Sequence, residues 1–416
     1  MTALGASPAP IFFLPGYHCN PCCYNLAAMF QFSCLPPLSL YIHFPWCVRK
    51  CPYCDFNSHE IRQERKQEGA YIESLIADLE TELPRTWGRT VVSIFMGGGT
   101  PSLFSPESID RLLSALRARL PLSAETEITL EANPGTVEQA RFAEYRDAGV
   151  NRLSIGIQSF HDAQLQALGR IHTRREAILA AEAAHLAGFE NFNLDLMFAL
   201  PGQALKEALD DVQTAIALEP AHLSYYQLTI ESNTLFHHHP PALPDEDIAW
   251  QMQESAQTLF HTAGYRQYEV SAYARPGKEC VHNLNYWRFG DYLGIGAGAH
   301  DKITDAHTQT IHRNWKVKHP DDYLTTAGTS RVIAGSRTLS PQDAVLEFMM
   351  NALRLTHGFD HRLFSEHTGL PLHFAEKGLQ QAEQLGWLKQ DQNTICPTAK
   401  GRRFLDDLIS LFLPDT

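Results

Sequence analysis

Residues 43–59 read HFPWCVRKCPYCDFNSH, in which Cys47, Cys51 and Cys54 have the spacing C-x3-C-x2-C. A zinc site or a closed iron-sulfur site takes four protein ligands, whereas the next candidate position here, Phe56, is apolar. Thiolates are soft donors that suit iron-sulfur clusters. The motif therefore predicts a cluster with three protein ligands and one iron left for a ligand from solution or substrate. The alternative, three buried free cysteines, is disfavoured by this spacing directly after a predicted strand.

From residue 39 onward the sequence alternates short β-branched or aromatic runs with longer amphipathic runs. This alternation is typical of an α/β protein with a parallel sheet wound with helices. Six β-α units are too few for a closed eight-unit barrel and suit an open, partial (β/α)6 barrel, with an ordinary doubly wound sheet as the alternative. The predicted strands cover residues 39–44, 91–97, 127–133, 152–158, 192–198 and 222–230.

Residues with unusual chemistry fall at or just past the carboxyl ends of separate predicted strands. Active sites of β/α barrels are built from the loops at that end, so this placement favours the barrel. The residues are Cys47, Gly97, Glu131, Gln158 and Asp195.

Two predicted helix starts carry the capping-box pattern, in which a side chain bonds a free backbone N–H three residues on. They are Thr136 with Gln139 and Thr173 with Glu176.

The composition describes an ordinary globular chain of 416 residues, 44% hydrophobic, with a formal net charge of -13. This length predicts two or three domains. The acidic balance argues against a nucleic-acid partner. Nine unevenly spread cysteines fit a reducing compartment better than a disulfide framework, so we expect a cytoplasmic protein. No apolar run reaches the ~18 residues that a transmembrane helix needs.

Residues 1–36 are predicted to be an N-terminal extension. The first thirty residues lack helical or strand periodicity, lack the basic start of a signal peptide, and hold Cys19, Cys22 and Cys23. A second metal site is one interpretation of these cysteines. The favoured one is a disordered or spurious upstream segment with Met29 as the real start, because segments without periodicity rarely pack.

After the predicted barrel, residues 37–270, comes an aromatic and glycine-rich segment, residues 271–338, that contains HNLNYW. Residues 339–416 turn helical again and end with a short strand pair, the pattern of a winged-helix-like domain. Because the chain is acidic, we expect this domain to pack as a lid and not to bind DNA.

The sequence resembles the radical S-adenosylmethionine (SAM) superfamily, and within it the oxygen-independent coproporphyrinogen oxidase group and its haem-chaperone branch. The resemblance covers roughly residues 37–410 and is carried by LPPLSLYIHFPWCVRKCPYCDFNSH, FMGGGTPSLF, EANPGT, RLSIGIQSF, LGRIH, NLDLMFALPGQ, YQLTIE, HNLNYW and GIGAGAH. It implies a partial barrel whose Cys47, Cys51 and Cys54 hold a 4Fe-4S cluster, with SAM on the open iron.

The same resemblance implies a set of SAM contacts on the strand-end loops. Glycines after a strand let the backbone approach a ligand, carboxylates accept ribose hydroxyls, and a guanidinium pairs a carboxylate. Taken singly, each polar residue is more often a satisfied surface or helix-cap group. The positions that match the family are Tyr41, Tyr53, Gly98, Gly99, Thr100, Glu131, Gln158, Arg170 and Asp195.

Two departures bear on function. The oxidases of this group carry a further cysteine where this chain has Phe56, which speaks against enzymatic coproporphyrinogen oxidation. The chain also has HNLNYW, the H-N-x-x-Y-W motif of the chaperone branch, in which His282, Tyr286 and Trp287 offer an imidazole and aromatic walls to haem at a site separate from the cluster. We therefore expect a haem chaperone that passes haem to an acceptor protein, a respiratory protein being one candidate. The alternative is an oxygen-independent coproporphyrinogen III dehydrogenase.

Overall fold

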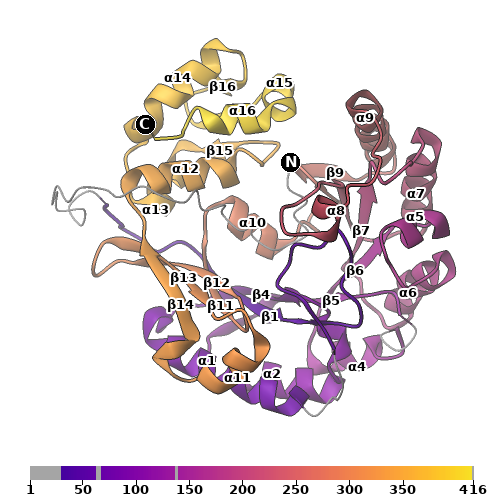
Figure 1. Ribbon diagram of the computed structural model, residues 1–416. Coiled ribbons are helices and arrows are strands. Elements are labelled where there is room, and N and C mark those ends of the chain that lie inside the picture. Colours follow the sequence, from indigo (N-terminus) through magenta and orange to yellow (C-terminus); the bar gives the residue numbers. More distant parts are fainter. Residues whose placement is uncertain (1–29, 62–66, 136–138, 415–416) are drawn as a thin grey trace.

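The computed structural model describes residues 30–61, 67–135 and 139–414 (Figure 1). Its main feature is one open sheet of 12 strands in the order β14-β13-β12-β11-β1-β4-β5-β6-β7-β8-β10-β9. The central six strands are parallel neighbours and confirm the predicted strands. They are β1 (Leu38–Phe44), β4 (Val91–Gly98), β5 (Leu122–Ala132), β6 (Arg152–Gln158), β7 (Phe192–Phe198) and β8 (His222–Gln227).

Helices cover the outer face of these strands, so the open partial barrel is confirmed and the doubly wound alternative is not (Figure 1). The predicted capping box of Thr173 and Glu176 begins α6, whereas Thr136 lies outside the described residues. The outer helices are α1 (Glu68–Thr86), α2 (Pro106–Arg117), α4 (Phe142–Ala148), α5 (Asp162–Ala167), α6 (Arg174–Leu186), α7 (Leu205–Ala217) and α9 (Glu246–Thr262).

Strand β1 shows how the sequence divides the two faces of the sheet. Successive side chains of a strand point to opposite faces. Leu40 and Ile42 are fully buried in the core between strands and outer helices. Tyr41 and His43 alternate with them and face the inside of the barrel, where they line a cavity.

The sheet continues through the segment 271–338, which the sequence marked only as aromatic and glycine-rich. β11 pairs in parallel with β1, and three antiparallel strands follow it. At the other edge, β10 and β9 close the sheet beside β8. These strands are β9 (Arg266–Glu269), β10 (Ala272–Ala274), β11 (Asp291–Ile295), β12 (His300–Asp305), β13 (Thr310–Lys316) and β14 (Ile333–Thr338).

Short elements complete the barrel and its loops. The helices are α8 (Leu235–His238) and α11 (Pro320–Thr326), and η3 (Pro101–Leu103) and η4 (Ser330–Val332) are 3-10 turns. A parallel pair, β2 (Trp46–Cys47) and β3 (His59–Glu60), frames the cysteine motif.

The HNLNYW motif forms a short helix, α10 (Val281–Trp287), that contacts β4, β1 and β11. Glu127 of β5 accepts hydrogen bonds from the backbone N–H groups of Val281 and His282 at 3.2 and 3.1 Å. A carboxylate at a helix N-terminus satisfies free N–H groups and complements the helix dipole. The position of α10 is therefore fixed by the barrel.

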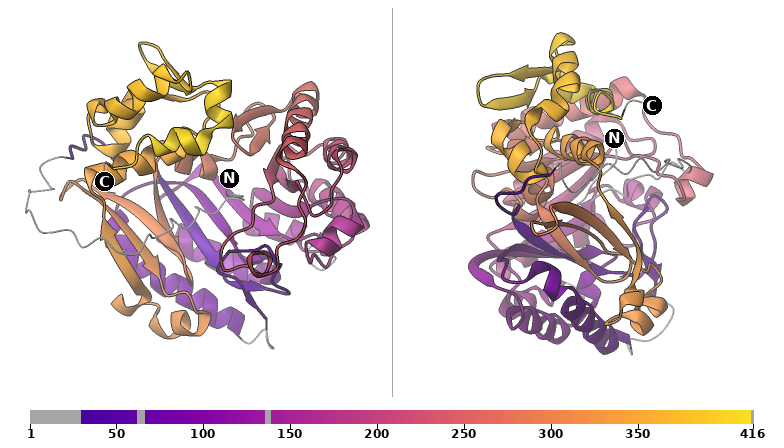
Figure 2. Two further views of the ribbon diagram at one scale, coloured as in Figure 1. Left: turned by 45° about the horizontal axis from the view of Figure 1, so that its top comes forward. Right: turned by 90° about the vertical axis from the view of Figure 1, so that its left-hand side faces the viewer.

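The predicted helical C-terminal domain is present, stacked over the orange strands of the extended sheet (Figure 2). It has its own apolar core and a three-stranded sheet in the order β15-β17-β16, so a third strand joins the predicted strand pair. Its elements are α12 (Pro341–Ala352), β15 (Phe359–Asp360), α13 (His361–Thr368), η5 (Leu372–Ala375), α14 (Glu376–Gln384), β16 (Leu388–Gln390), β17 (Thr394–Pro397), α15 (Ala399–Arg403) and α16 (Leu405–Ser410).

The predicted N-terminal extension differs from expectation where it can be seen. Cys19, Cys22 and Cys23 lie outside the described residues. Phe30 and Phe32 are buried in the core of the C-terminal domain, at 2% and 9% exposure, so residues 30–36 are not a loose segment. Two aromatic side chains gain enough from burial to hold a short stretch that has no secondary structure.

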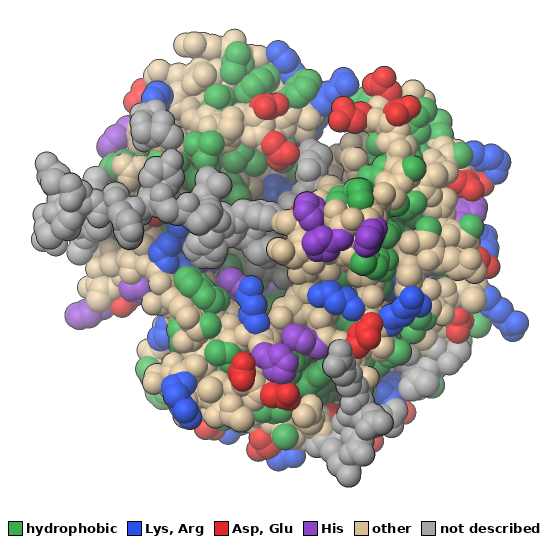
Figure 3. All heavy atoms as spheres, viewed as in Figure 1, with side chains coloured by type: hydrophobic (Ala, Val, Ile, Leu, Met, Phe, Trp, Pro, Cys, Tyr) green, Lys and Arg blue, Asp and Glu red, His purple; other side chains and the backbone are tan. Residues whose placement is uncertain are grey.

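The surface carries both signs of charge. On the face shown in Figure 3, Lys and Arg side chains are interspersed with Asp and Glu. No helix in the described ranges is both long and apolar enough to span a membrane.

Candidate functional site

The three cysteines of the motif line one cavity of about 480 Å³ at the carboxyl ends of the barrel strands. Each sulfur has a polar neighbour. Thr100 Oγ1 donates to Cys47 Sγ at 3.6 Å, and Arg170 Nη1 donates to Cys51 Sγ at 3.6 Å. The sulfur of Cys54 lies 3.7 Å from the hydroxyl oxygen of Ser58. Donors to sulfur stabilise thiolates, which is the form that binds metal.

The donor set suits a multi-iron cluster better than a single ion. Burial raises the pKa of Cys47 and raises that of Cys54 to about 11, so these two thiols stay protonated until a metal displaces the protons. Within the described ranges, no three His, Cys, Asp or Glu side chains converge on one metal ion. Thiolates that each bind a different iron of a cube do not have to meet at one point, so the arrangement fits a 4Fe-4S cluster.

Two glycines at the end of β4, Gly98 in the strand and Gly99 just after it, line this cavity. Gly98 has φ +108°, and a Cβ there would lie 2.4 Å from the His43 ring. A Cβ on Gly99 would lie 2.5 Å from the carbonyl oxygen of Trp46. Both positions therefore leave no room for a side chain and let the backbone approach closely. Gly98, Gly99 and Thr100, which the sequence predicts as SAM contacts, line the cavity.

Two predicted carboxylates, Glu131 on β5 and Asp195 on β7, line the smaller cavity from strands on either side of β6. Glu131 accepts a hydrogen bond from the backbone N–H of Gly98 at 3.0 Å. Asp195 accepts from Ser154 Oγ at 3.1 Å and from Asn193 Nδ2 at 2.8 Å. Burial, reinforced by the charge of Asp195, raises the pKa of Glu131 to about 8, and burial also raises the pKa of Asp195. These carboxyls are poised to bond hydroxyl groups of a ligand.

Asn133 joins the predicted residues into one network and was missed in the sequence. Its Nδ2 donates to Thr100 Oγ1 at 2.8 Å, and its Oδ1 accepts from Arg170 Nη2 at 2.6 Å. Because Thr100 and Arg170 each bond a cysteine sulfur, Asn133 bridges the contacts of Cys47 and Cys51. Asn133 follows directly after β5 in the EANPGT motif, and this strand-end position could have indicated that it belongs to the site.

Three more residues complete the smaller cavity. Gln158 ends β6 with φ +69°, and its Oε1 accepts from Tyr226 OH at 2.8 Å. Tyr53, which was predicted, also lines the cavity, and its ring packs 6.5 Å from that of Phe236. Tyr226 was not predicted.

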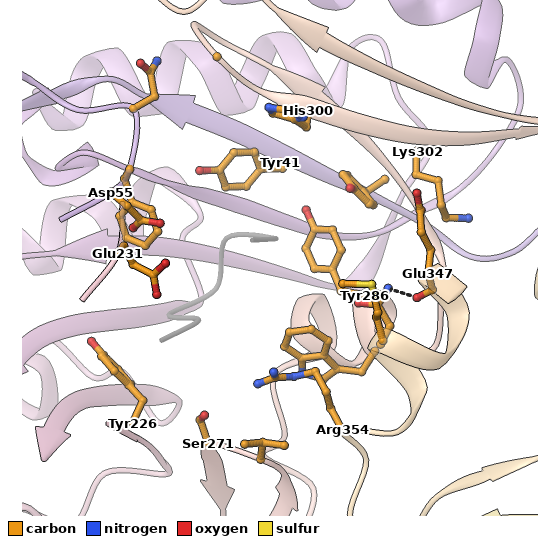
Figure 4. A pocket seen from close by; sticks show the side chains of 18 of the residues that line it. Tyr41, Asp55, Tyr226, Glu231, Ser271, Tyr286, His300, Lys302, Glu347 and Arg354 are labelled. Atoms are coloured by element: carbon orange, nitrogen blue, oxygen red, sulfur yellow. Dashed lines mark hydrogen bonds between the residues drawn. The ribbon is translucent and has the colours of Figure 1, made fainter. Parts of the chain in front are cut away.

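A second, larger cavity of about 760 Å³ lies between the inner face of the barrel and the C-terminal domain (Figure 4). This volume is typical of pockets that bind a sizeable organic ligand. Its walls come from β1, β8, α10, β12, β13, α12 and α16, so elements far apart in the sequence enclose it. The two cavities adjoin, since Phe56, Ser58 and Tyr226 line both.

Tyr286 and Trp287 of α10 line the larger cavity, at 6% and 5% exposure. Tyr286 OH and Trp287 Nε1 are buried without a hydrogen-bond partner among the described residues. The guanidinium of Arg354 lies 4.3 Å over the Trp287 ring, and its Nε likewise lacks a partner there. Buried donors without partners are costly, and a bound ligand can satisfy them.

Two predicted positions differ from expectation. Tyr41 lines the larger cavity instead of the cluster cavity, because it points inward from the middle of β1. His282 is fully buried and lines neither cavity. Its Nδ1 lies 2.9 Å from Ser93 Oγ, its ring packs 5.0 Å from that of Phe95, and burial lowers its pKa to about 3. In this structure the contacts of His282 with Ser93 and Phe95 hold α10 against β4.

Comparison with known proteins agrees with this geometry. Residues 41–215 match the Radical SAM superfamily, and residues 339–404 match the HemN C-terminal domain. The curated "Heme chaperone HemW" of Escherichia coli K12 is 49% identical over 92% of this chain and 99% of its own length. The chain belongs to the HemW group of the radical SAM superfamily. The protein of the same name from Haemophilus influenzae is 48% identical over 92% of this chain and 99% of its own length.

Structural similarity supports this membership at the level of the fold. The radical SAM enzyme coproporphyrinogen III oxidase (HemN) of Escherichia coli has a TM-score of 0.77 at 23% identity, over 93% of this chain and 92% of its own. Membership of the radical SAM superfamily implies a 4Fe-4S cluster and SAM, which the three cysteines and the glycine, carboxylate and Arg170 contacts of the smaller cavity fit.

Proposed function

We propose that the protein is a haem chaperone that binds haem in the larger cavity and passes it to an acceptor protein. The observation that carries this proposal is the cavity of about 760 Å³ that Tyr286 and Trp287 of the HNLNYW helix line. A porphyrin needs flat apolar walls, and its carboxylates need donors. Arg354, with an unpartnered Nε beside Trp287, supplies such a donor. The HemW relatives carry the name heme chaperone.

The smaller cavity holds a 4Fe-4S cluster on Cys47, Cys51 and Cys54 in this proposal. The cluster supplies, when bound, one iron with an open coordination position. The surrounding residues of the cavity orient SAM beside it through backbone approach, carboxylate and guanidinium contacts. These residues are Tyr53, Gly98, Gly99, Thr100, Glu131, Gln158, Arg170 and Asp195.

The C-terminal domain controls access to haem. Glu347, Met350 and Arg354 of α12 and Leu405 of α16 form one wall of the larger cavity. Haem can therefore enter or leave when this domain shifts against the sheet, and an acceptor that contacts the domain can receive the released haem.

Haem titration of the anaerobically purified protein tests this function. A saturable absorbance band at one haem per chain is expected, and Trp287→Ala should weaken binding by about tenfold through the lost aromatic wall. Trp250→Ala on α9 is the matched control, since Trp250 does not line the cavity. An unchanged affinity in Trp287→Ala would contradict the proposed site. Transfer is followed by mixing the haem-loaded protein with an apo-cytochrome of the b type.

A coproporphyrinogen III dehydrogenase is the second candidate. The observation that favours it is the contact between the two cavities, because a radical formed near the cluster would lie close to a porphyrinogen in the larger one. Phe56 stands at this contact, where the oxidases carry a further cysteine. Incubation with SAM, a reductant and coproporphyrinogen should give no protoporphyrinogen if the chaperone function holds.

A further inference from the structure

The larger cavity offers three imidazoles within the part of the chain that the structure describes. They belong to His43, His59 and His300. A histidine is one of the side chains that bind haem iron, and binding needs a ring nitrogen that is not already engaged. The His282 ring of the HNLNYW motif does not line this cavity. It is fully buried against Ser93 and Phe95 of β4, where its Nε2 has no hydrogen-bond partner among the described residues.

Two of the three imidazoles already bond the protein. His43 is 5% exposed, with Nδ1 3.0 Å from Tyr41 OH and Nε2 2.8 Å from the carbonyl oxygen of Asn57. His59 Nε2 lies 3.3 Å from Asn57 Oδ1, and its ring packs against that of His319 at 5.4 Å. Iron binding by either residue would break contacts that hold the cysteine loop.

His300 differs in that its ring makes no hydrogen bond with any described residue. Its backbone is rigidly held, because it begins β12 and pairs with Trp315 of β13. The neighbouring Lys316 N–H donates to the carbonyl oxygen of Ala299 at 2.8 Å. A Cβ on Gly294 would lie 2.0 Å from the His300 carbonyl oxygen, so β11 packs directly on this residue. A half-buried imidazole on a fixed strand is preorganised for a ligand.

The surroundings of His300 suit a porphyrin face. Its ring lies 6.3 Å from that of Trp315 at an interplanar angle of 25°. Figure 4 shows His300 on the wall of the cavity that Tyr41, Tyr286 and Arg354 also line. A porphyrin there meets aromatic side chains from β1 and α10. Arg354 pairs with Glu269 through Nη2 at 3.0 Å, and its unpartnered Nε is the donor left for a propionate group.

We propose that the imidazole of His300 binds the iron of the haem held in the larger cavity. This inference rests on the proposed function and assigns the iron ligand to a residue outside the HNLNYW motif, in which His282 was expected to offer an imidazole to haem. The HNLNYW motif then has a different role. Tyr286 and Trp287 form a wall of the larger cavity, and His282 holds in place the helix α10 that carries them.

Chemical rescue in the full-length protein tests the assignment. His300→Gly leaves a space where exogenous imidazole can bind. Ferrous haem in the parent protein should show an iron-imidazole stretching band by resonance Raman spectroscopy, and His300→Gly should lose it. Haem affinity should fall by about tenfold or more, since even the loss of an outer-shell partner costs that much at metal sites. Added imidazole should restore both the band and the absorbance spectrum.

His59→Gln separates His300 from another imidazole of the same cavity. This variant should keep the iron-imidazole band, and an unchanged iron and sulfide content shows that it is folded. A parent-like band in His300→Gly without added imidazole would overturn the assignment and leave the chaperone function intact. Absence of saturable haem binding by the parent protein would overturn the proposed function and the assignment together.

Discussion

Arg170 donates a hydrogen bond to the sulfur of Cys51, with 3.6 Å between Nη1 and Sγ. Its Nη2 donates to Asn133 Oδ1 at 2.6 Å and to the carbonyl oxygen of Gly156 at 2.8 Å. The guanidinium is always charged and is locked in place by these bonds. A fixed positive charge therefore stands beside one proposed cluster ligand.

Arg170→Gln should lower the reduction potential of the cluster, because positive charge and hydrogen bonds to the cysteine sulfurs favour the reduced form. A differential loss of about 1.4 kcal/mol corresponds to about 59 mV for a one-electron couple. Redox titration without SAM, followed by electron paramagnetic resonance, measures the shift. Arg170→Lys keeps the charge, so its reduction potential should lie between those of the parent protein and Arg170→Gln. Arg146→Gln, at an exposed position, is the control and should keep the parental potential. An unshifted potential in Arg170→Gln would mean that the contact does not tune the cluster.

Alanine at Cys47, Cys51 or Cys54 should abolish the cluster, since two thiolates cannot hold the cube stably. Iron and sulfide counts on anaerobically reconstituted variants are the measurement. Cys396→Ala in the C-terminal domain is a matched control that should keep the full content, because its thiol lies outside the smaller cavity. Full cluster content in Cys51→Ala would refute the ligand assignment.

Gly98→Ala should destabilise the protein and weaken SAM binding. The new Cβ would lie 2.4 Å from the His43 ring, at a φ of +108° that alanine adopts only with strain. Strain of this kind costs about 1 to 3 kcal/mol, before the displacement of His43 is counted. Gly264→Ala measures the cost of the strained backbone without crowding, since Gly264 has φ +88° and nothing lies within 4 Å of the added Cβ. Equal losses of unfolding free energy in the two variants would show that the crowding has no effect.

The pKa of Glu131 predicts how stability depends on pH. This carboxyl, with an ordinary pKa of 4.5, titrates near about 8 in the folded protein because it is buried beside Asp195. Between these values the folded state holds one proton more than the unfolded state. The contribution of Glu131 to the free energy of unfolding should therefore fall as pH rises from about 5 to about 8, by up to about 1.4 kcal/mol per pH unit.

Urea denaturation of cluster-free protein across this pH range measures the effect. Glu131→Gln should remove this contribution and make the fall less steep, whereas the contributions of other buried carboxyls with raised pKa values, such as Asp195 and Asp211, should remain. The exposed Glu144→Gln on α4 should keep the parental slope. A parental slope in Glu131→Gln would assign the pH dependence to other groups.

Much of the barrel could be predicted because its signals are local. Six apolar runs, the capping box at Thr173 and the spacing of the cysteines each depend on a few adjacent residues. The position of Glu131 near the carboxyl end of β5 then follows from the direction of parallel strands, whereas Asp195, expected at a strand end, lies in the middle of β7. Family resemblance added the identity of the cofactors.

The larger cavity could not be predicted in the same way. Its walls come from β1, α10, β12 and α12, and no local pattern indicates that these elements meet. Tyr41 was assigned to SAM because strand alternation gives the face of a side chain but not the cavity on that face. His282 was expected to contact haem because the sequence cannot show which side of the short helix α10 packs against the strands of the barrel.

Phe32→Ala should destabilise the C-terminal domain, although Phe32 belongs to the segment that the sequence predicted to be an unpacked extension. Its ring is 9% exposed in the apolar core of that domain and lies where a Cβ on Gly369 would approach Cζ to 2.8 Å. The backbone N–H of Gln31 also donates to the Gly369 carbonyl oxygen at 2.8 Å. Removal of a buried phenyl ring costs about 3 to 5 kcal/mol. Thermal unfolding should show a lower midpoint for the domain, whereas the exposed Leu35→Ala should change it little. An unchanged midpoint in Phe32→Ala would mean that this segment contributes nothing to the domain core, as the sequence alone had indicated.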